Sequence, residues 1–295
     1  MKQRIALFHF LLIILALDSC RPAPLDIDIQ PNPPGLVVAS QIIPSTAMAV
    51  LLTRSFSALE NGTFVKGTGE VAPGFLEKLI VKGAFVTVSY VGVTDTLFPV
   101  DTIPGLYVSV NTLQIPYQTY TLKAYDPQSN ESVEAQTQML PAVKFDSIYP
   151  TAKSDTSVSL KLRFYDPPGH NWYLMNVYRA KTKIGAANLD INSVPFTVGK
   201  NQLLKSQLIT DYVYNTALIE ITAIIKGILP TDTIGVTFSN ITEGHFLFLS
   251  AQNSSGDLFG QFFHEPVNIP TNVKNGYGYF SASDPDVKVI DLNQY

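Results

Sequence analysis

The single cysteine is the residue of this chain with the clearest chemistry. Cys20 is the only thiol among 295 residues, so the chain has no disulfide framework and no zinc or redox site built on paired cysteines. It follows a leader that carries Lys2 and Arg4 and then an apolar run over residues 6–16. A membrane-spanning helix needs about 20 apolar residues, so this shorter run is typical of a secretory signal.

The residues around Cys20 predict a lipid anchor. Leu17 stands three positions before it and Ser19 directly precedes it, which is the pattern that lipoprotein signal peptidase cleaves once the thiol carries a diacylglyceryl group. We expect residues 1–19 to be removed, leaving acyl chains such as palmitate on Cys20 to hold the protein in the membrane. The alternative is an ordinary secretory signal that happens to contain a cysteine.

Beyond Cys20, the sequence contains no catalytic or metal-binding motif. Metalloprotease, nucleophile-elbow and phosphate-loop patterns are absent, and no histidine behind the leader has a second ligand at zinc spacing. Asp284 and Asp286 resemble calcium ligands, but their loop lacks the glycine and glutamate of an EF-hand, which favours solvated turn carboxylates. The sequence therefore predicts no catalytic residue, no metal and no cofactor, and an enzyme ranks third among the candidate functions.

The composition excludes one large class of partner. The chain is 46% hydrophobic and 15% charged, with a net charge of −4. Because nucleic-acid affinity depends on neutralising phosphates with basic residues, this balance argues against a nucleic-acid binder.

Two aromatic segments are candidates for contact with a ligand or partner. Residues 164–173 surround a Pro-Pro-Gly turn; either the rings fill the core of a β-hairpin, or Trp172 and Tyr173 form a platform for a sugar or peptide. Residues 262–280 form either a sandwich corner or a partner-facing loop. The residues proposed to face a partner there are Asn272, Asn275, Gly276, Tyr277 and Gly278.

The body of the chain predicts strands. Apolar and polar residues alternate with a period of two in many segments, most clearly over residues 158–164. We expect a lipid-anchored tether over 20–35, an immunoglobulin-like β-sandwich over 36–141 and a larger antiparallel β domain over 142–295. Turn residues punctuate the strands, and no internal repeat of fixed period is visible.

Helical periodicity is scarce. Residues Glu243 to Asn253 form the best helix candidate, and Leu203 to Ile209 form a weaker one. The fold class expected is therefore mainly β, with one or two short helices in the C-terminal domain.

Short motifs distributed over nearly the whole chain behind Cys20 carry a family resemblance. They are Leu25-Asp26-Ile27-Asp28, Leu36-Val37-Val38, Val50-Leu51-Leu52-Thr53-Arg54-Ser55, Ala84-Phe85-Val86, Gln136-Thr137-Gln138-Met139-Leu140-Pro141, Tyr165-Asp166-Pro167-Pro168-Gly169 and the closing stretch 266–280. Together they resemble the Bacteroidota envelope lipoproteins catalogued as domain of unknown function 4249. The closing stretch is the most specific part, whereas Gln138-Met139-Leu140 departs from the usual valine before the proline.

The resemblance implies a location and a partner but no activity. It implies an outer-membrane lipoprotein, on either the periplasmic face or the cell surface, that serves as a non-enzymatic accessory or ligand-delivery partner of a TonB-dependent β-barrel receptor. The alternative is a surface glycan- or peptide-binding module or adhesin. Triplets of aspartate, hydroxyl residue and aliphatic residue match the O-glycosylation pattern of that phylum at Thr96, Thr102, Ser147 and Thr233.

The lipid anchor makes a direct prediction. Cys20→Ser removes the thiol that receives the diacylglyceryl group, so the protein should move from the membrane fraction to the soluble envelope fraction. Immunoblots of fractionated cells measure this change. A variant that stays with the membrane would contradict the lipid anchor.

Overall fold

Most of the chain behind the tether is described by a computed structural model. The residues that it describes are 34–43, 47–56, 74–180, 201–214, 216–254 and 269–295. The chain divides into the units Met1–Asn32 and Pro33–Tyr295, and every described residue belongs to the second. The expected signal peptide over 1–19, the lipidation site Cys20 and nearly all of the tether over 20–35 therefore lie outside the described residues.

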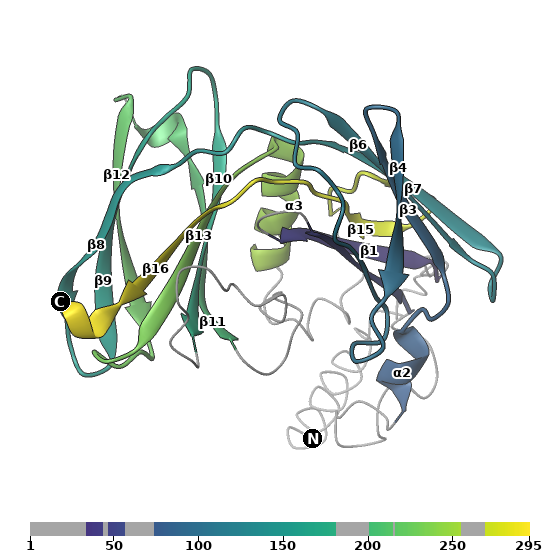
Figure 1. Ribbon diagram of the computed structural model, residues 1–295, viewed down its shortest axis with the longest axis horizontal. Coiled ribbons are helices and arrows are strands. Elements are labelled where there is room, and N and C mark those ends of the chain that lie inside the picture. The colour runs from purple at the N-terminus through teal and green to yellow at the C-terminus, as the bar shows by residue number, and fades with distance from the viewer. Residues whose placement is uncertain (1–33, 44–46, 57–73, 181–200, 215, 255–268) are drawn as a thin grey trace, which may run out of the picture. The chain divides into compact units, whose positions relative to one another are not determined.

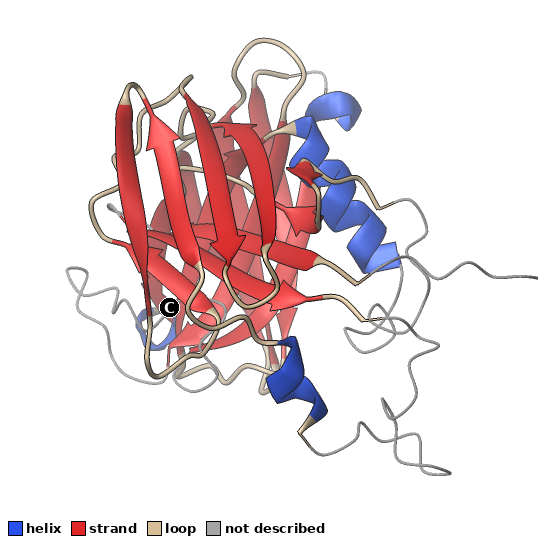
Figure 2. Cartoon of the chain, turned by 90° about the vertical axis from the view of Figure 1, so that its right-hand side faces the viewer, coloured by secondary structure: helices blue, strands red, loops and turns tan. Residues whose placement is uncertain are grey.

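Strands dominate the described residues (Figure 2), and the first seven form a β-sandwich. One sheet contains β1, β2 and β5, and the other contains β7, β6, β3 and β4 in that order; the two are continuous with each other, because β4 also pairs with β5. Their bounds are β1 Leu36–Ile43, β2 Ala47–Arg54, β3 Phe85–Tyr90, β4 Val93–Pro99, β5 Leu106–Ser109, β6 Thr119–Asp126 and β7 Glu131–Gln138, and a short helix, α2, spans Phe75–Leu79. All of these strand pairs are antiparallel.

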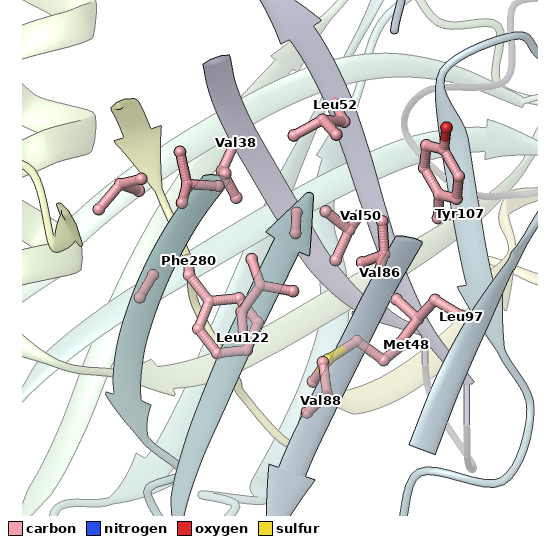
Figure 3. Close-up of a cluster of buried hydrophobic side chains, with 14 of the residues drawn as sticks. Val38, Met48, Val50, Leu52, Val86, Val88, Leu97, Tyr107, Leu122 and Phe280 are labelled. Carbon is pink, nitrogen blue, oxygen red and sulfur yellow. The ribbon is translucent and has the colours of Figure 1, made fainter. Parts of the chain in front are cut away.

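Period-two alternation builds the core of this first sandwich. Along β6, for example, Tyr120, Leu122 and Ala124 are buried while the residues at alternate positions are more exposed, because successive side chains of a strand point to opposite faces. Figure 3 shows the resulting cluster of apolar side chains between the strands. The buried Tyr107 hydroxyl accepts from the Ala84 N–H at 2.9 Å and donates to the Val81 carbonyl at 3.1 Å, which offsets the cost of its burial.

A salt-bridge cluster links the two sheets of the first sandwich. Arg54, at the end of β2, pairs with Asp126 at the end of β6 and with Glu131 at the start of β7, the latter at 2.6 Å. Burial raises the pKa of Asp126, but the backbone N–H of Gln128 and the Arg54 guanidinium outweigh that effect and lower it. The buried carboxylate therefore has a cation as its direct partner.

The next seven strands that pair with one another form a second sandwich with its own core. One sheet has the order β12-β9-β8, and the other has the order β11-β10-β13-β16. Their bounds are β8 Phe145–Lys153, β9 Ser157–Tyr165, β10 Trp172–Ala180, β11 Asn201–Thr210, β12 Leu218–Lys226, β13 Thr233–Ile241 and β16 Asp286–Asp291. The core includes the contacting rings of Phe145, Phe164, Tyr173 and Phe238.

The two sandwiches share one strand order. In each, the first, second and fifth strands make one sheet, while the fourth, third, sixth and seventh make the other. This interleaving is the Greek-key arrangement of immunoglobulin-like domains. The expected fold class, an immunoglobulin-like sandwich followed by a larger antiparallel β domain with short helices, is confirmed. The structural repeat has no counterpart in a sequence period, because each strand needs only an alternating pattern.

Between β13 and β16 the chain leaves the second sandwich and returns to the first. This connection holds α3, Glu243–Ser254, and the short strands β14, Val273–Lys274, and β15, Tyr277–Tyr279. Strand β14 pairs with β7, and β15 runs parallel to β1, which is visible as yellow beside purple in Figure 1.

We call residues 271–282 the closing segment. Its Val273, Phe280 and Ala282 lie in the core of the first sandwich, and Figure 3 shows Phe280 near Leu122. The sequence assigned the whole of 142–295 to the second domain, whereas this part of it completes the first. The reason is that the first sandwich leaves the outer edges of β1 and β7 unpaired without it.

The two helix expectations had different outcomes. The helix expected over Glu243 to Asn253 is confirmed as α3. The helix expected over Leu203 to Ile209 is wrong, because these residues belong to β11, which pairs antiparallel with β10. Pairing with an existing strand outweighs a weak local helical preference. Within the described ranges, no helix has both the length and the apolar character to cross a bilayer.

The closing segment depends on a glycine at a close backbone approach. Gly278 has a φ of +89°, and a β-carbon there would overlap the Val38 carbonyl. Gly278→Ala should therefore destabilise the fold by about 3 kcal/mol, from left-handed strain plus the clash. Gly92→Ala is the matched control, since Gly92 has a φ of +75° with open space around it and should cost only about 1 kcal/mol. Urea unfolding measures both, and equal losses would contradict the role of the close approach.

The partly buried His245 in α3 predicts an acid-sensitive stability. Its ring stacks on Tyr279 with centroids 5.2 Å apart, and burial lowers its pKa from 6.5 to about 4. Between these two pKa values, the imidazole is protonated in the unfolded chain but neutral in the folded chain. The contribution of neutral His245 to the free energy of unfolding is therefore complete above about pH 6.5 and is lost as the pH falls toward about 4.

The size of this effect is set by the pKa difference. Between about pH 7.5 and about pH 5, the wild type should lose about 2 kcal/mol more stability than His245→Gln, which has no imidazole to protonate. Urea unfolding at the two pH values measures it. Parallel losses in both proteins would show that His245 does not carry the effect.

Candidate functional site

The structure packs the expected partner-facing loop against the first sandwich. The Asn272 side chain accepts from the Phe280 N–H at 2.8 Å and donates to the Gln136 and Phe280 carbonyls at 2.8 and 2.7 Å. The bond to Gln136 holds the closing segment to β7, and the two bonds to Phe280 join the two ends of the segment. Asn272 therefore has a structural role in this fold.

The other four residues of that loop differ in exposure. A β-carbon on Gly276 would lie 2.6 Å from the Leu36 carbonyl oxygen, and Gly278 is packed against Val38, so both glycines serve close packing. Tyr277 is partly buried, whereas Asn275 is exposed with a φ of 59°. The partner-facing role stays a prediction, and this packing confines it to the exposed tip at Asn275.

The two candidate aromatic-contact residues separate into one core residue and one surface residue. Tyr173 is fully buried, and its ring contacts Phe164 and Phe238 with centroids 5.0 and 5.1 Å apart. Trp172 is only partly buried. Successive residues of a strand point to opposite faces. The alternative in which the ring fills the core therefore holds for Tyr173, and only Trp172 is placed for contact with a ligand or partner.

Three loop segments at one end of the second sandwich bring further chemistry beside Trp172. Asp166 follows β9, His170 precedes β10, and η2, Asp211–Val213, follows β11. Trp172 is paired with Thr210 and Ile241 in the strand register, so this is also the end from which the chain departs toward α3. We call Asp166, His170, Trp172, Asp211 and Tyr212 the acid–aromatic cluster.

Both carboxylates of the cluster hold the local backbone and core together. The Tyr173 hydroxyl donates to Asp166 Oδ1, which gives this otherwise buried polar group a partner. Asp211 is only 6% exposed, and its Oδ2 accepts from the Asn171 N–H at 2.8 Å. Its Oδ1 has no hydrogen-bond partner among the described residues and lies 3.9 Å from His170 Nδ1.

The aromatic part of the cluster lies on the surface. His170 and Tyr212 stack with centroids 4.3 Å apart and planes at 9°, and Tyr212 is 61% exposed. The Trp172 ring lies 6.4 Å from that of Tyr212 at a tilt of 59°. These ring faces are available for stacking on a ligand.

Burial and mutual repulsion shape the electrostatics of the cluster. Burial raises the pKa of Asp166, the hydrogen bond from Tyr173 opposes the rise, and the negative charge of Asp211 adds to it. The pKa of Tyr173 is raised by burial and by its bond to the Asp166 carboxylate, so the phenol stays protonated and donates. The cluster therefore places two carboxyl groups beside an exposed aromatic surface.

The expected calcium-like carboxylates have a structural role instead. Asp286 Oδ2 accepts from the Phe145 N–H at 2.9 Å, which ties the start of β16 to the start of β8. Burial raises the pKa of Asp284, as does the nearby Asp286, while Lys144 lowers it. Across the described ranges, no group of three or more His, Cys, Asp or Glu side chains is arranged to hold a metal ion.

Sequence reasoning missed Asp211 and Tyr212. They follow the segment Leu203 to Ile209, whose pattern predicts a weak helix. A helix at this place does not predict that a strand ends there and a loop begins. If the same segment is taken as a strand, the strand ends at Thr210, whose side chain caps η2. The sequence Thr-Asp-Tyr then indicates a loop. This sequence pattern predicts that Asp211 and Tyr212 lie at the end of a strand, but it does not predict that they lie beside His170.

The four candidate glycosylation sites differ in accessibility. Thr96 and Thr102 are exposed and Thr233 is partly buried. The Ser147 hydroxyl is buried without a hydrogen-bond partner among the described residues. If modification follows folding, only accessible hydroxyls can react, so the prediction is best placed on Thr96 and Thr102.

Comparison with solved structures returns tandem fibronectin type III segments at low similarity. A two-domain segment from chicken tenascin is 10% identical, with 88% of this chain and 98% of that chain covered, at a TM-score of 0.22. Domains FN1–FN3 of chicken CNTN1 are 12% identical, with 72% of this chain and 62% of that chain covered, at a TM-score of 0.23. The fold assignment therefore rests on the strand order of the chain itself.

Comparison at the level of sequence identifies a family. No curated protein sequence matches the chain. The family described as Domain of unknown function (DUF4249) matches residues 23–288, a span that includes the first sandwich, nearly all of the second, the acid–aromatic cluster and the closing segment. The chain belongs to the DUF4249 family.

Proposed function

We propose that this DUF4249 protein is a Bacteroidota outer-membrane lipoprotein that acts as a non-enzymatic accessory or ligand-delivery partner of a TonB-dependent receptor. The leader and Cys20 supply the anchor, through acyl chains in the outer membrane. The choice of a TonB-dependent receptor as the partner rests on the family resemblance.

The observation that carries the docking proposal is the exposed ring stack of His170 and Tyr212 at the loop end of the second sandwich. In antibody variable domains, loops that cluster at one end of a sandwich form the binding surface. Tyrosine is enriched at protein interfaces because its ring supplies a large contact area with a polar tip. A surface of this composition on a rigid sandwich suits a protein partner.

The structural uses of Asp126 and Asp286 support a non-enzymatic role. Asp126 pairs with Arg54, and Asp286 binds the backbone of Phe145, so each is occupied in holding strands together. A catalytic acid or base must instead be free to reach a reacting group.

A second candidate function is direct binding of a glycan or peptide at the cell surface. The exposed faces of Tyr212 and His170, with Trp172 beside them, favour it because aromatic faces stack on both sugars and peptide side chains. Here the aromatic surface would contact the ligand itself rather than a receptor.

Affinity purification tests the docking proposal. Tagged protein extracted from membranes in mild detergent should bring a β-barrel receptor with it. Tyr212→Ala should lower that recovery at least about tenfold if the ring is a central contact. Tyr295→Ala, which removes a similarly exposed tyrosine at the C-terminus, should leave it unchanged.

The negative results are equally informative. Recovery of the lipoprotein alone, even after gentle crosslinking, would contradict the docking proposal. Binding of soluble Cys20→Ser protein to glycan or peptide arrays, with no receptor present, would instead favour the second candidate.

A further inference from the structure

Asp211 is a buried carboxylate whose charge is incompletely satisfied. Its side chain is 7% exposed, and Oδ1 faces His170 Nδ1 across 3.9 Å, a separation too long for a hydrogen bond. Asp166 lies close enough for its pKa to be raised by the charge of Asp211. Among the described residues, no lysine or arginine pairs with either carboxylate. Burying such charge without a cation is costly.

The same chain shows how it satisfies a buried carboxylate elsewhere. Asp126 is 1% exposed and receives a guanidinium from Arg54, in addition to the backbone N–H of Gln128 and the hydroxyl of Ser129. Asp211 accepts from the backbone N–H of Asn171 at 2.8 Å and from the side-chain amide of Asn171 at 3.4 Å, but among the described residues it has no cation equivalent to Arg54. The comparison indicates that Asp211 lacks the cationic partner that the buried Asp126 has.

The rings beside Asp211 suit the same kind of group. His170 and Tyr212 present stacked, exposed faces, and Trp172 is tilted against Tyr212. Aromatic faces attract cations through the negative charge of their π-systems, and guanidinium groups also stack on them. Oδ1 is itself buried, so a cation reaches it only if the facing His170 side chain moves, and an exposed side chain such as His170 changes rotamer on a fast timescale.

We propose that the acid–aromatic cluster binds the cationic side chain of an arginine or lysine on a partner protein, with Asp211 Oδ1 accepting from the cation and Tyr212 stacking on it. The inference deepens the proposed function, on which it rests for the existence of a protein partner. Arginine fits better than lysine, because its planar guanidinium can stack and donate at once.

Trp172 is a built-in reporter for this site. It is the only tryptophan of the chain, and its ring contacts that of Tyr212. Soluble full-length Cys20→Ser protein is titrated with N-acetylarginine amide to about 10 mM, since a single cationic contact is expected to have a millimolar Kd. N-acetylcitrulline amide, which keeps the shape but not the charge, is the matched control ligand. Saturation-transfer NMR detects binding that leaves the fluorescence unchanged.

The expected result is a saturable change in Trp172 fluorescence with the arginine probe and no saturation with the citrulline probe. Asp211→Asn should weaken binding at least about tenfold, and Tyr212→Ala about threefold to tenfold, because each removes one of the two contacts. Asp155→Asn, which changes an exposed carboxylate in the β8–β9 turn, should bind like the parent. Tyr212→Ala lies at the surface, so it tests the site even if Asp211→Asn fails to fold.

Several results would overturn the inference. These are the absence of binding by both methods, equal response to arginine and citrulline, or binding that survives both variants. Two further probes separate other sources of positive charge. Tighter binding of spermidine than of the arginine probe would assign the site to a free polyamine, and tight binding of Ca²⁺ would assign it to a metal.

The inference and the proposed function fail in different ways. Loss of arginine binding together with normal receptor recovery would overturn the cation site and leave the docking proposal intact. Arginine binding without any receptor recovery would support the cation site and contradict the receptor as its partner. Receptor recovery that falls with Asp211→Asn but not with Asp155→Asn would support both.

Discussion

The return of the closing segment to the first sandwich is the constraint on which the rest of the structure depends. Val273, Phe280 and Ala282 fill one core although they follow nearly all the strands of the other in the chain. The segment gives β7 and β1 their outer neighbours, so neither is left as an open edge that could pair with another chain. The approach is so close that Gly278 lies against the Val38 carbonyl. The first sandwich can therefore not be cut from the chain at Pro141 without losing part of its own structure.

This arrangement also explains where binding chemistry is available. The closing segment completes the first sandwich, and the side chain of Asn272 binds the backbone there. The loop end of the second sandwich has no such cover from the described residues over Tyr212. The charged and aromatic side chains there are held by a rigid frame, because Tyr173 is anchored in the core and bonded to Asp166. A site built on such a frame retains its geometry without a ligand.

Much of the fold was predictable because it follows from local pattern. Alternation marked the strands, as along residues 158–164, and α3 was visible from its sequence. The failures have a common cause. Leu203 to Ile209 forms a strand because β10 offers it a partner, and Tyr173 lies in the core while Trp172 does not because of the strand register. The candidate site was only half predictable, since Asp211 lies beside His170 through a fold that pairs β10 with β11.

The sequence by itself determined the mainly β class and the family motifs, and it predicts the lipid anchor at Cys20, because each depends on residues that are near one another in the chain. Only the tertiary structure decided that the two sandwiches share a strand order, that the closing segment belongs to the first core, and that Asp211, His170 and Tyr212 meet. The physical reason is that sheet pairing and burial join residues far apart in sequence. Alternation indicates that a strand has a buried face, but it does not specify which neighbour covers that face.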